Sequence, residues 1–398
     1  MLVSARVFRY CLIIAIVAML VSIISKRSVP FGGSILKSST VKSIRSFSYT
    51  SSSSNGGEGG DYSSWSSHGS SKSYSTSSSS SSFTNPNAQS TSSPPVTTST
   101  ASLNYDSALT TFSNYSVAVA YQPKDRKPSS NMFKKSNRSP ALDSPSGEDN
   151  LFVSSQVSDG SIAVGVADGV GGWSEAGYDS SAISRELCSN MRKGFESAGN
   201  ASTTPKSVLD NAFKEVLQSE AVEIGGTTAC LGVFTPDLKL RVANLGDSWC
   251  GLFREYRLVK ETNFQTHNFN TPYQLAKIPQ HILRKAAMEG RRYIIDEPKL
   301  ADEYSWDLQK GDIVMFATDG VTDNVVPKDI EIFLKDHLED KKDAKLNDVA
   351  KKFVSEVVKV SKDGNFPSAF AQELSRLTGQ KYLGGKEDDI TVVLVKVV

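Results

Sequence analysis

Apolar residues recur in short runs from about residue 105 to the C-terminus, and turn residues separate the runs. Eight runs predict β-strands, over 116–120, 150–157, 161–167, 227–234, 238–245, 249–254, 312–317 and 390–397. Hairpin-sized turns such as Thr235-Pro236-Asp237 join several of them, which favours antiparallel pairing.

Helical periodicity marks four further segments, over 181–197, 205–221, 329–338 and 346–361. In the last of them, Val349, Phe353 and Val357 form one apolar stripe. Strands in runs with helices grouped between them are typical of layered α+β domains rather than of βαβ repeats. The pattern therefore predicts one α+β domain over 105–398, which is long enough to bury a sizeable core.

The residues before this domain have a different composition. Residues 1–48 contain basic residues and serines but no acidic residue, as mitochondrial presequences do. Within them, 11–24 is an apolar run shorter than the roughly 20 residues that span a bilayer. We expect mitochondrial targeting, with membrane association through 11–24 left open; the alternative is an anchor in the endoplasmic reticulum or nuclear envelope. Residues 49–104 are mostly Ser and Thr, which predicts a disordered linker.

Charge and residue types exclude several classes of function. The chain has 44 Lys and Arg residues against 43 Asp and Glu residues, which argues against a nucleic-acid binder. Its four cysteines lack metal-ligand spacing, so we expect Cys188, Cys230 and Cys250 to be buried and reduced. Its four histidines are scattered, which argues against a zinc hydrolase. Any metal ion would have to be held by oxygen.

Acidic residues stand at the ends of the apolar strands, where the predicted sheets meet solvent. They are Glu148-Asp149, Asp168, Asp247, Asp319 and Asp388-Asp389. Clustered carboxylates repel one another, and no Arg or Lys lies in the Asp-Gly turns. A divalent cation is therefore the simplest source of the positive charge that would keep these carboxylates ionised together. Oxygen ligands without His or Cys favour Mg²⁺ or Mn²⁺ over zinc.

Two such ions, roughly 3.5–4 Å apart, would share a bridging carboxylate and a bridging water. They would lower the pKa of that water and neutralise charge on the centre that it attacks. The acidic residues therefore predict metal-assisted hydrolysis that needs no Ser, His or Cys nucleophile. A phosphate ester fits this chemistry best.

Six motifs follow one another along residues 110–398. They are GEDN at 147–150, VADGVGGW at 166–173, GGTTA at 225–229, NLGDS at 244–248, ATDGVTD at 317–323 and EDDITV at 387–392. In this order they resemble the metal-dependent type 2C Ser/Thr protein phosphatases. The DGVGGW form, with THNFNTPYQL at 266–275, resembles the mitochondrial branch of that family, whose members are linked to mitochondrial metabolism, including ubiquinone synthesis.

The resemblance implies a four-layer α-β-β-α sandwich, in which helices flank two antiparallel sheets. It also implies two Mn²⁺ or Mg²⁺ ions in the active site, with a weaker third ion possible. The implied metal ligands are Glu148, Asp149, Asp168, Gly169, Asp247, Asp319, Asp323 and Asp388.

The same resemblance assigns roles to these residues. Asp168 would bridge the two ions, beside the carbonyl group of Gly169. Asp319 and Asp388 would complete one ion, and we expect Asp168 and Asp319 to be catalytic.

Four acidic positions complete the implied set. Glu148 or Asp149 would hold the second ion, largely through water. Asp247 and Asp323 match positions that bind the weaker third ion. Asp389 stands where most members have Asn, so Asp388 is the expected ligand of the last pair.

The chain departs from the family pattern at two positions. Val170 replaces a His that is thought to protonate the leaving group. Either His267 or a metal-bound water takes this role, or the step is slower. Ser144 replaces the phosphate-binding Arg, which leaves the substrate-binding residue unassigned. Basic residues that could substitute for that Arg are Lys134, Lys135 and Arg138. Trp173 either shapes substrate entry or packs on its motif.

These departures leave a second hypothesis open beside a phosphatase that acts on phosphoproteins. The chain could be a membrane-tethered pseudophosphatase or binding scaffold, in which the fold persists with weak catalysis. Its oligomeric state, native metal and physiological substrate stay open at this stage.

Overall fold

The computed structural model describes residues 107–126, 144–199, 203–341 and 343–398. The predicted targeting segment 1–48, with its apolar run 11–24, and the predicted linker 49–104 lie outside these ranges. Within the described ranges, no helix has both the length and the apolar character needed to cross a membrane.

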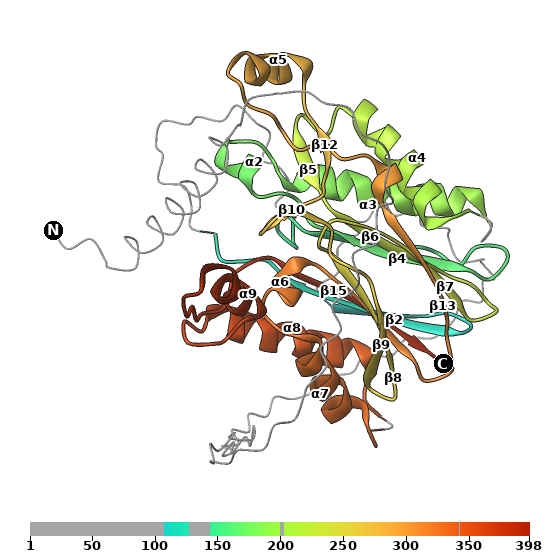
Figure 1. Ribbon diagram of the computed structural model, residues 1–398. Helices are drawn as coiled ribbons and strands as arrows, with labels where there is room; N and C mark the ends of the chain where they lie inside the picture. The colour runs from blue at the N-terminus through green and yellow to red at the C-terminus, as the bar shows by residue number, and fades with distance from the viewer. Residues whose placement is uncertain (1–106, 127–143, 200–202, 342) are drawn as a thin grey trace, which may run out of the picture. The chain divides into compact units, whose positions relative to one another are not determined.

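Two antiparallel sheets form the centre of the domain (Figure 1). The first has six strands in the order β1-β2-β15-β14-β8-β9. They span Ser107–Thr111 (β1), Tyr115–Gln122 (β2), Ile390–Val397 (β15), Ile313–Ala317 (β14), Trp249–Arg254 (β8) and Arg257–Glu261 (β9). The second has five strands in the order β13-β7-β6-β4-β3. They span Asp302–Asp307 (β13), Lys239–Leu245 (β7), Ala229–Phe234 (β6), Ile162–Ala167 (β4) and Asn150–Val153 (β3).

Helices cover the outer face of each sheet (Figure 1). On the five-stranded sheet lie α3 (Ser181–Ala198) and α4 (Pro205–Gln218). On the six-stranded sheet lie α7 (Pro327–Leu338) and α8 (Leu346–Lys362). The four layers confirm the predicted α-β-β-α sandwich.

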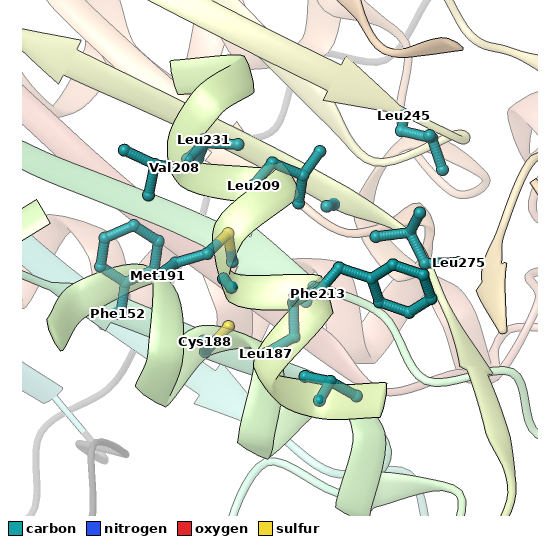
Figure 2. Packing of buried hydrophobic residues seen from close by; sticks show 14 of the residues in the cluster. Phe152, Leu187, Cys188, Met191, Val208, Leu209, Phe213, Leu231, Leu245 and Leu275 are labelled. Atoms are coloured by element: carbon teal, nitrogen blue, oxygen red, sulfur yellow. The ribbon is translucent and has the colours of Figure 1, made fainter. Parts of the chain in front are cut away.

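Three layers of buried apolar side chains hold this arrangement together, one between the sheets and one under each helical layer. Figure 2 shows the layer under α3 and α4, where Leu187 and Met191 of α3 lie near Leu209 and Phe213 of α4 and Leu231 of β6. Residues four apart share one face of a helix, so the sequence period places them together. Full burial of each such side chain contributes roughly 1.5–3 kcal/mol.

Aromatic side chains fill the layer between the sheets. The Phe234 ring of β6 meets the Tyr115 ring of β2 edge to face at 5.1 Å and the Phe316 ring of β14 at 6.3 Å between centroids. Because these rings come from both sheets, they fix the distance between the sheets. Cys188, Cys230 and Cys250 are buried and free, as predicted.

All eight predicted strands and all four predicted helices are present. The run 227–234 is divided at Thr228 into β5 (Gly225–Thr227) and β6, because the Thr228 N–H donates to the Asp168 carbonyl oxygen at 2.9 Å. The edge strands β1, β9 and β13 were not predicted. In β13 only Trp306 is buried, so the strand carries little apolar signal.

The remaining elements are short or lie around the site. They are α2 (Gly172–Glu175), β10 (Thr266–Asn268), β11 (Thr271–Pro272), β12 (Leu275–Lys277), α5 (Gln280–Met288), the 3₁₀ turn Pro298–Leu300, α6 (Asp319–Thr322) and α9 (Ala369–Thr378).

Candidate metal centre

The strand register brings the predicted acidic residues to one end of the sandwich. In the five-stranded sheet, the first residue of β3 pairs with Ala167, the last residue of β4. In the six-stranded sheet, Ala317 at the end of β14 pairs with Val392 of β15 and Trp249 of β8. Asp149, Asp168, Asp319, Asp388 and Asp247 flank these paired positions, so they emerge from both sheets at the same end.

Electrostatic coupling shows that the carboxylates converge. Removal from water raises the pKa of Asp168 well above its usual range, and the charges of Asp319, Asp149, Asp388 and Asp247 raise it further. Lys386 Nζ lies 2.8 Å from Asp319 Oδ2 and 3.5 Å from Asp388 Oδ2, so these half-buried carboxylates are neighbours. Asp168 is close enough for their charges to act on it, although up to 220 positions separate the three residues in sequence.

Two oxygen atoms in this cluster have no hydrogen-bond donor among the residues that the structure describes. Asp149 is buried, and its Oδ2 accepts a hydrogen bond of 2.7 Å from the Thr318 hydroxyl. Its Oδ1 and the Oδ1 of Asp319 are buried but accept no hydrogen bond from any described residue. A buried carboxylate oxygen without a donor is costly, and a cation would satisfy it.

Neighbouring threonines hold Asp168 in place. The Asp168 N–H donates to the Thr228 hydroxyl at 3.1 Å, and the Asp168 carbonyl oxygen accepts from the Thr227 hydroxyl at 2.9 Å. The next residue, Gly169, packs so closely that a Cβ there would lie 2.6 Å from the Glu148 carbonyl oxygen. The glycine of the Asp-Gly pair is thus required by close backbone contact.

Glu148 lies in a different environment. Burial alone would raise the pKa of Glu148, but hydrogen bonds from Ser174 and Ser180 and the charges of Lys124 and Arg126 lower it to about 2. The Ser174 and Ser180 hydroxyls lie 2.6 and 2.5 Å from Glu148 Oε1. These contacts keep the side chain ionised and fix its orientation.

Asp388 and Asp389 differ in how their oxygens are used. Asp389 is buried and accepts hydrogen bonds from the N–H groups of Lys124 and Glu148, both at 2.8 Å, and from the Arg126 guanidinium. Its oxygens are therefore occupied by the protein itself. Asp388 is half-buried, and its Oδ1 accepts hydrogen bonds from the Lys124 ammonium at 2.8 Å and from the Asp389 N–H at 3.0 Å. Burial and the charge of Asp319 raise the pKa of Asp388, which indicates that it lies nearer the other carboxylates and supports its choice as the ligand of the pair.

Three basic side chains that were not predicted enter the cluster. None of them lies in an Asp-Gly turn: Lys124 and Arg126 follow β2, and Lys386 precedes β15. Lys124 Nζ lies 2.8 Å from Asp388 Oδ1 and 3.2 Å from Glu148 Oε2. The absence of Arg and Lys from the Asp-Gly turns therefore does not leave the carboxylates without basic neighbours, because distance in sequence does not show which side chains the fold brings in. For Lys386, two positions before Asp388, sequence proximity was an available signal.

The donor chemistry nevertheless fits divalent cations. Among the described residues, no three His, Cys or acidic side chains are already arranged to hold an ion, and the ammonium groups of Lys124 and Lys386 contact Asp388 and Asp319. The two donor-free oxygens and the mutual repulsion still call for more positive charge than these groups provide. Carboxylate oxygens are the ligands that Mg²⁺ and Mn²⁺ prefer.

A cleft of about 490 Å³ opens beside the acidic cluster. Its walls come from the segment around β10 and β11, from α6 and from α9. The lining residues are Asp247, Phe264, Thr266, Phe269, Asn270, Asp319, Thr322, Asp323, Ala369, Phe370, Glu373 and Leu377. The cleft is therefore lined both by carboxylates of the cluster and by the aromatic rings of Phe264, Phe269 and Phe370.

The residues considered for leaving-group protonation, substrate entry and phosphate binding do not line this cleft within the described residues. His267 is not part of the cleft lining: its Nε2 lies 2.9 Å from Asp296 Oδ2, and its ring stacks on Tyr273. Trp173 packs against the rings of Tyr178 and Tyr293, which supports a packing role. Lys134, Lys135 and Arg138 lie outside the described residues.

Comparisons with known proteins agree with this fold. No family model matches the chain. Over 293 residues it is 52% identical to protein phosphatase 2C homolog 7, mitochondrial, of Saccharomyces cerevisiae, covering 71% of this chain and 82% of the yeast protein. It is 36% identical over 256 residues to the protein phosphatase PTC7 homolog fig of Drosophila ananassae, covering 63% and 73% of the two chains.

Among solved structures, the photosystem II phosphatase PBCP has the same fold, with a TM-score of 0.56 at 23% identity; the match covers 71% of this chain and 99% of that one. The chain belongs to the type 2C protein phosphatases and is a metal-dependent protein-serine/threonine phosphatase. Within that family it falls in the branch of the yeast mitochondrial homolog 7.

Proposed function

We propose that this phosphatase hydrolyses phosphoserine and phosphothreonine on mitochondrial proteins with the help of two Mn²⁺ or Mg²⁺ ions. The observation that carries the proposal is the cluster of converging carboxylates in which Asp149 and Asp319 each keep a buried oxygen without a donor. When bound, the ions would lower the pKa of the attacking water and neutralise charge on the phosphoryl group.

The ligands divide between the two sheets. Asp168, at the end of β4, would contact both ions, together with the Gly169 carbonyl group. Asp319 and Asp388, from the six-stranded sheet, would complete one ion. The pair Glu148-Asp149, before β3, would hold the other. Asp247 and Asp323 would be the ligands of a weaker third ion.

The balance of charge supports two ions. The acidic side chains of the cluster are Glu148, Asp149, Asp168, Asp247, Asp319, Asp323, Asp388 and Asp389. The basic side chains are Lys124, Arg126 and Lys386. Two divalent cations would offset most of the negative charge that remains.

Lys124 is our candidate for the phosphate contact that Ser144 cannot make. Its ammonium group lies between Glu148 and Asp388, which we assign to different ions, and 29% of its side chain is exposed. A cation at this point would face an anion bound over both ions. Arg126 is a poorer candidate, since its guanidinium is already held by Asp389.

Mitochondrial substrates are proposed on two grounds. The composition of residues 1–48 is that of a presequence, and the yeast relative bears the word mitochondrial in its name. Both favour a mitochondrion over the alternative of the endoplasmic reticulum or nuclear envelope. By the family resemblance, we propose a regulatory role in mitochondrial metabolism such as ubiquinone synthesis.

The test uses the full-length protein after removal of metal with EDTA. Adding Mn²⁺ is expected to restore hydrolysis of p-nitrophenyl phosphate and of a phosphoserine peptide. Asp168→Asn and Asp319→Asn are each expected to lower the rate about a hundredfold or more. Asp307→Asn, an exposed acid on β13, is the matched control and is expected to keep full activity.

A binding scaffold would give a different result. In that case the wild-type protein with Mn²⁺ would hydrolyse neither substrate faster than Asp168→Asn does. That outcome would reject the phosphatase mechanism and favour the scaffold hypothesis.

A further inference from the structure

Lys386 has its ammonium group inside the acidic cluster. Its Nζ lies 2.8 Å from Asp319 Oδ2 and 3.5 Å from Asp388 Oδ2, and it donates a hydrogen bond to Asp323. Only 19% of the side chain is exposed. One lysine thus contacts both carboxylates that the proposed function assigns to one metal ion.

The backbone of Lys386 is held in place independently of its charge. The Lys386 N–H donates to Asn324 Oδ1 at 2.9 Å, and the Lys386 carbonyl oxygen accepts from Asn324 Nδ2 at 2.8 Å. The same Nδ2 donates to the Gly320 carbonyl oxygen at 2.8 Å, in the turn that carries Asp319. Asn324 therefore fixes the start of the Lys386 side chain beside Asp319 whatever the state of the carboxylates.

An ammonium group and a divalent ion compete at such a position. The ammonium uses the oxygens of Asp319 and Asp388 that would bind the ion, and two positive charges a few ångströms apart repel strongly in a partly buried site. Without a metal ion, however, the same ammonium offsets the repulsion among the carboxylates. One side chain would then stabilise the metal-free site and weaken metal binding.

The side chain also has other partners at the edge of the cleft. Lys386 Nζ lies 3.2 Å from Asn270 Oδ1 and 5.4 Å from the centre of the Phe370 ring. An amide oxygen and the face of an aromatic ring both stabilise an ammonium group, and neither belongs to the metal ligands. The ammonium can move toward them when an ion takes the carboxylates.

We propose that Lys386 is the counter-ion of the metal-free site, which holds Asp319 and Asp388 until a divalent ion displaces it toward Asn270 and Phe370. This proposal rests on the metal ligands assigned under the proposed function. In it Lys386 is a positioning residue: it keeps the carboxylates together before the metal ion arrives and sets how tightly the ion binds.

The test measures Mn²⁺ binding by isothermal titration calorimetry to full-length, metal-stripped protein. Lys386→Met is expected to bind Mn²⁺ about tenfold more tightly than wild type, or more, because the competing charge is gone. Metal-free Lys386→Met is expected to unfold at a lower temperature than wild type, and saturating Mn²⁺ is expected to remove the difference. Lys386→Arg keeps the charge and is expected to show no tightening.

Lys362→Met is the matched control, since Lys362 forms an exposed pair with Asp125. It is expected to change neither the affinity nor the unfolding temperature of the metal-free protein. A purely structural role of Lys386 would give the opposite pattern: Lys386→Met would be less stable both with and without Mn²⁺, and its Mn²⁺ affinity would be unchanged or weaker. That pattern overturns the proposal.

A second variant keeps the test valid if Lys386→Met does not fold. Asn270→Gly removes the alternative partner without touching a carboxylate, and glycine tolerates the positive φ of 53° at this position. The displaced ammonium then loses a partner, so Mn²⁺ is expected to bind several-fold more weakly. Unchanged affinity would contradict the proposal.

The two proposals fail in distinguishable ways. If wild type binds Mn²⁺ and hydrolyses phosphate esters while Lys386→Met shows wild-type affinity, only the role of Lys386 is rejected. If wild type neither binds Mn²⁺ nor hydrolyses the substrates, the metal assignment itself is rejected.

Discussion

Gly320 lies against the backbone of Asp389 so closely that a Cβ at Gly320 would stand 1.9 Å from the Asp389 carbonyl oxygen. This contact joins the turn that carries Asp319 to the segment that carries Asp388. The two carboxylates are therefore brought together by direct packing of their backbones.

Gly320→Ala is expected to separate these segments, because the methyl group collides with backbone rather than with a movable side chain. We expect Mn²⁺-dependent hydrolysis to fall about a hundredfold or more and the free energy of unfolding to drop by roughly 1–3 kcal/mol. Steady-state kinetics and urea denaturation measure the two effects. Gly364→Ala, where a Cβ meets no atom within 4 Å, is the control; equal behaviour of the two variants would contradict the packing argument.

Metal binding is expected to depend on pH. Burial raises the pKa of Asp323 to about 7; the Lys386 charge opposes this rise and the Asp319 charge adds to it. Because the folded pKa lies above the ordinary value of 3.8, Asp323 binds more protons in the folded state, and its contribution to metal-free stability declines as pH rises from about 4 to 7.

A divalent ion needs the ionised carboxylate, so Mn²⁺ affinity is expected to rise between about pH 5 and 7.5 and to level off above. Proton release on binding checks this, measured by calorimetry in buffers of different ionisation enthalpy. Affinity without pH dependence and without proton release would show that the carboxyl groups are already ionised.

Lys124→Ala is expected to weaken substrate binding. At saturating Mn²⁺ we expect KM for p-nitrophenyl phosphate and the inhibition constant of inorganic phosphate to rise together, about tenfold, since both report on the same anion contact. Lys124→Arg is expected to recover most of the loss. A fall in kcat at constant KM and constant phosphate inhibition would instead assign Lys124 to the carboxylates alone.

Phe370 is expected to contribute to the binding of the peptide around the phosphorylated residue. It lines the cleft beside Asp323, and its ring contacts Phe269 at 4.9 Å between centroids. Phe370→Ala is expected to raise KM for a phosphoserine peptide roughly three- to tenfold, through lost apolar contact, and to leave KM for p-nitrophenyl phosphate near wild type.

Leu383→Ala, an exposed apolar residue that does not line the cleft, serves as the control for Phe370→Ala. If Phe370→Ala raised KM equally for both substrates, the cleft would have no separate role in peptide binding.

The sequence alone predicted most of the secondary structure and the class of the site. A strand such as Ile162–Ala167 or a helix such as Leu346–Lys362 is marked by a local period of apolar residues, which depends little on the rest of the fold. The acidic residues at the strand ends could be found in the same way, and their motifs indicated the family.

The edge strands β1, β9 and β13 and the different roles of neighbouring acidic residues could be recognised only in the tertiary structure. β13 is held by its pairing with β7 rather than by its own sequence pattern. Asp388 and Asp389 are adjacent and chemically identical, and only their surroundings show that Asp389 binds Arg126 while Asp388 faces the cluster.

Local periodicity and chain order thus determined the strands, the helices and the list of carboxylates. The tertiary structure decided which charges stand beside those carboxylates, because Coulomb energy depends on distance in space. Lys124 and Lys386 both contact Asp388, yet 264 positions separate Lys124 from it and two separate Lys386. Proximity in sequence already pointed to Lys386, whereas only the folded chain could show that Lys124 belongs to the site.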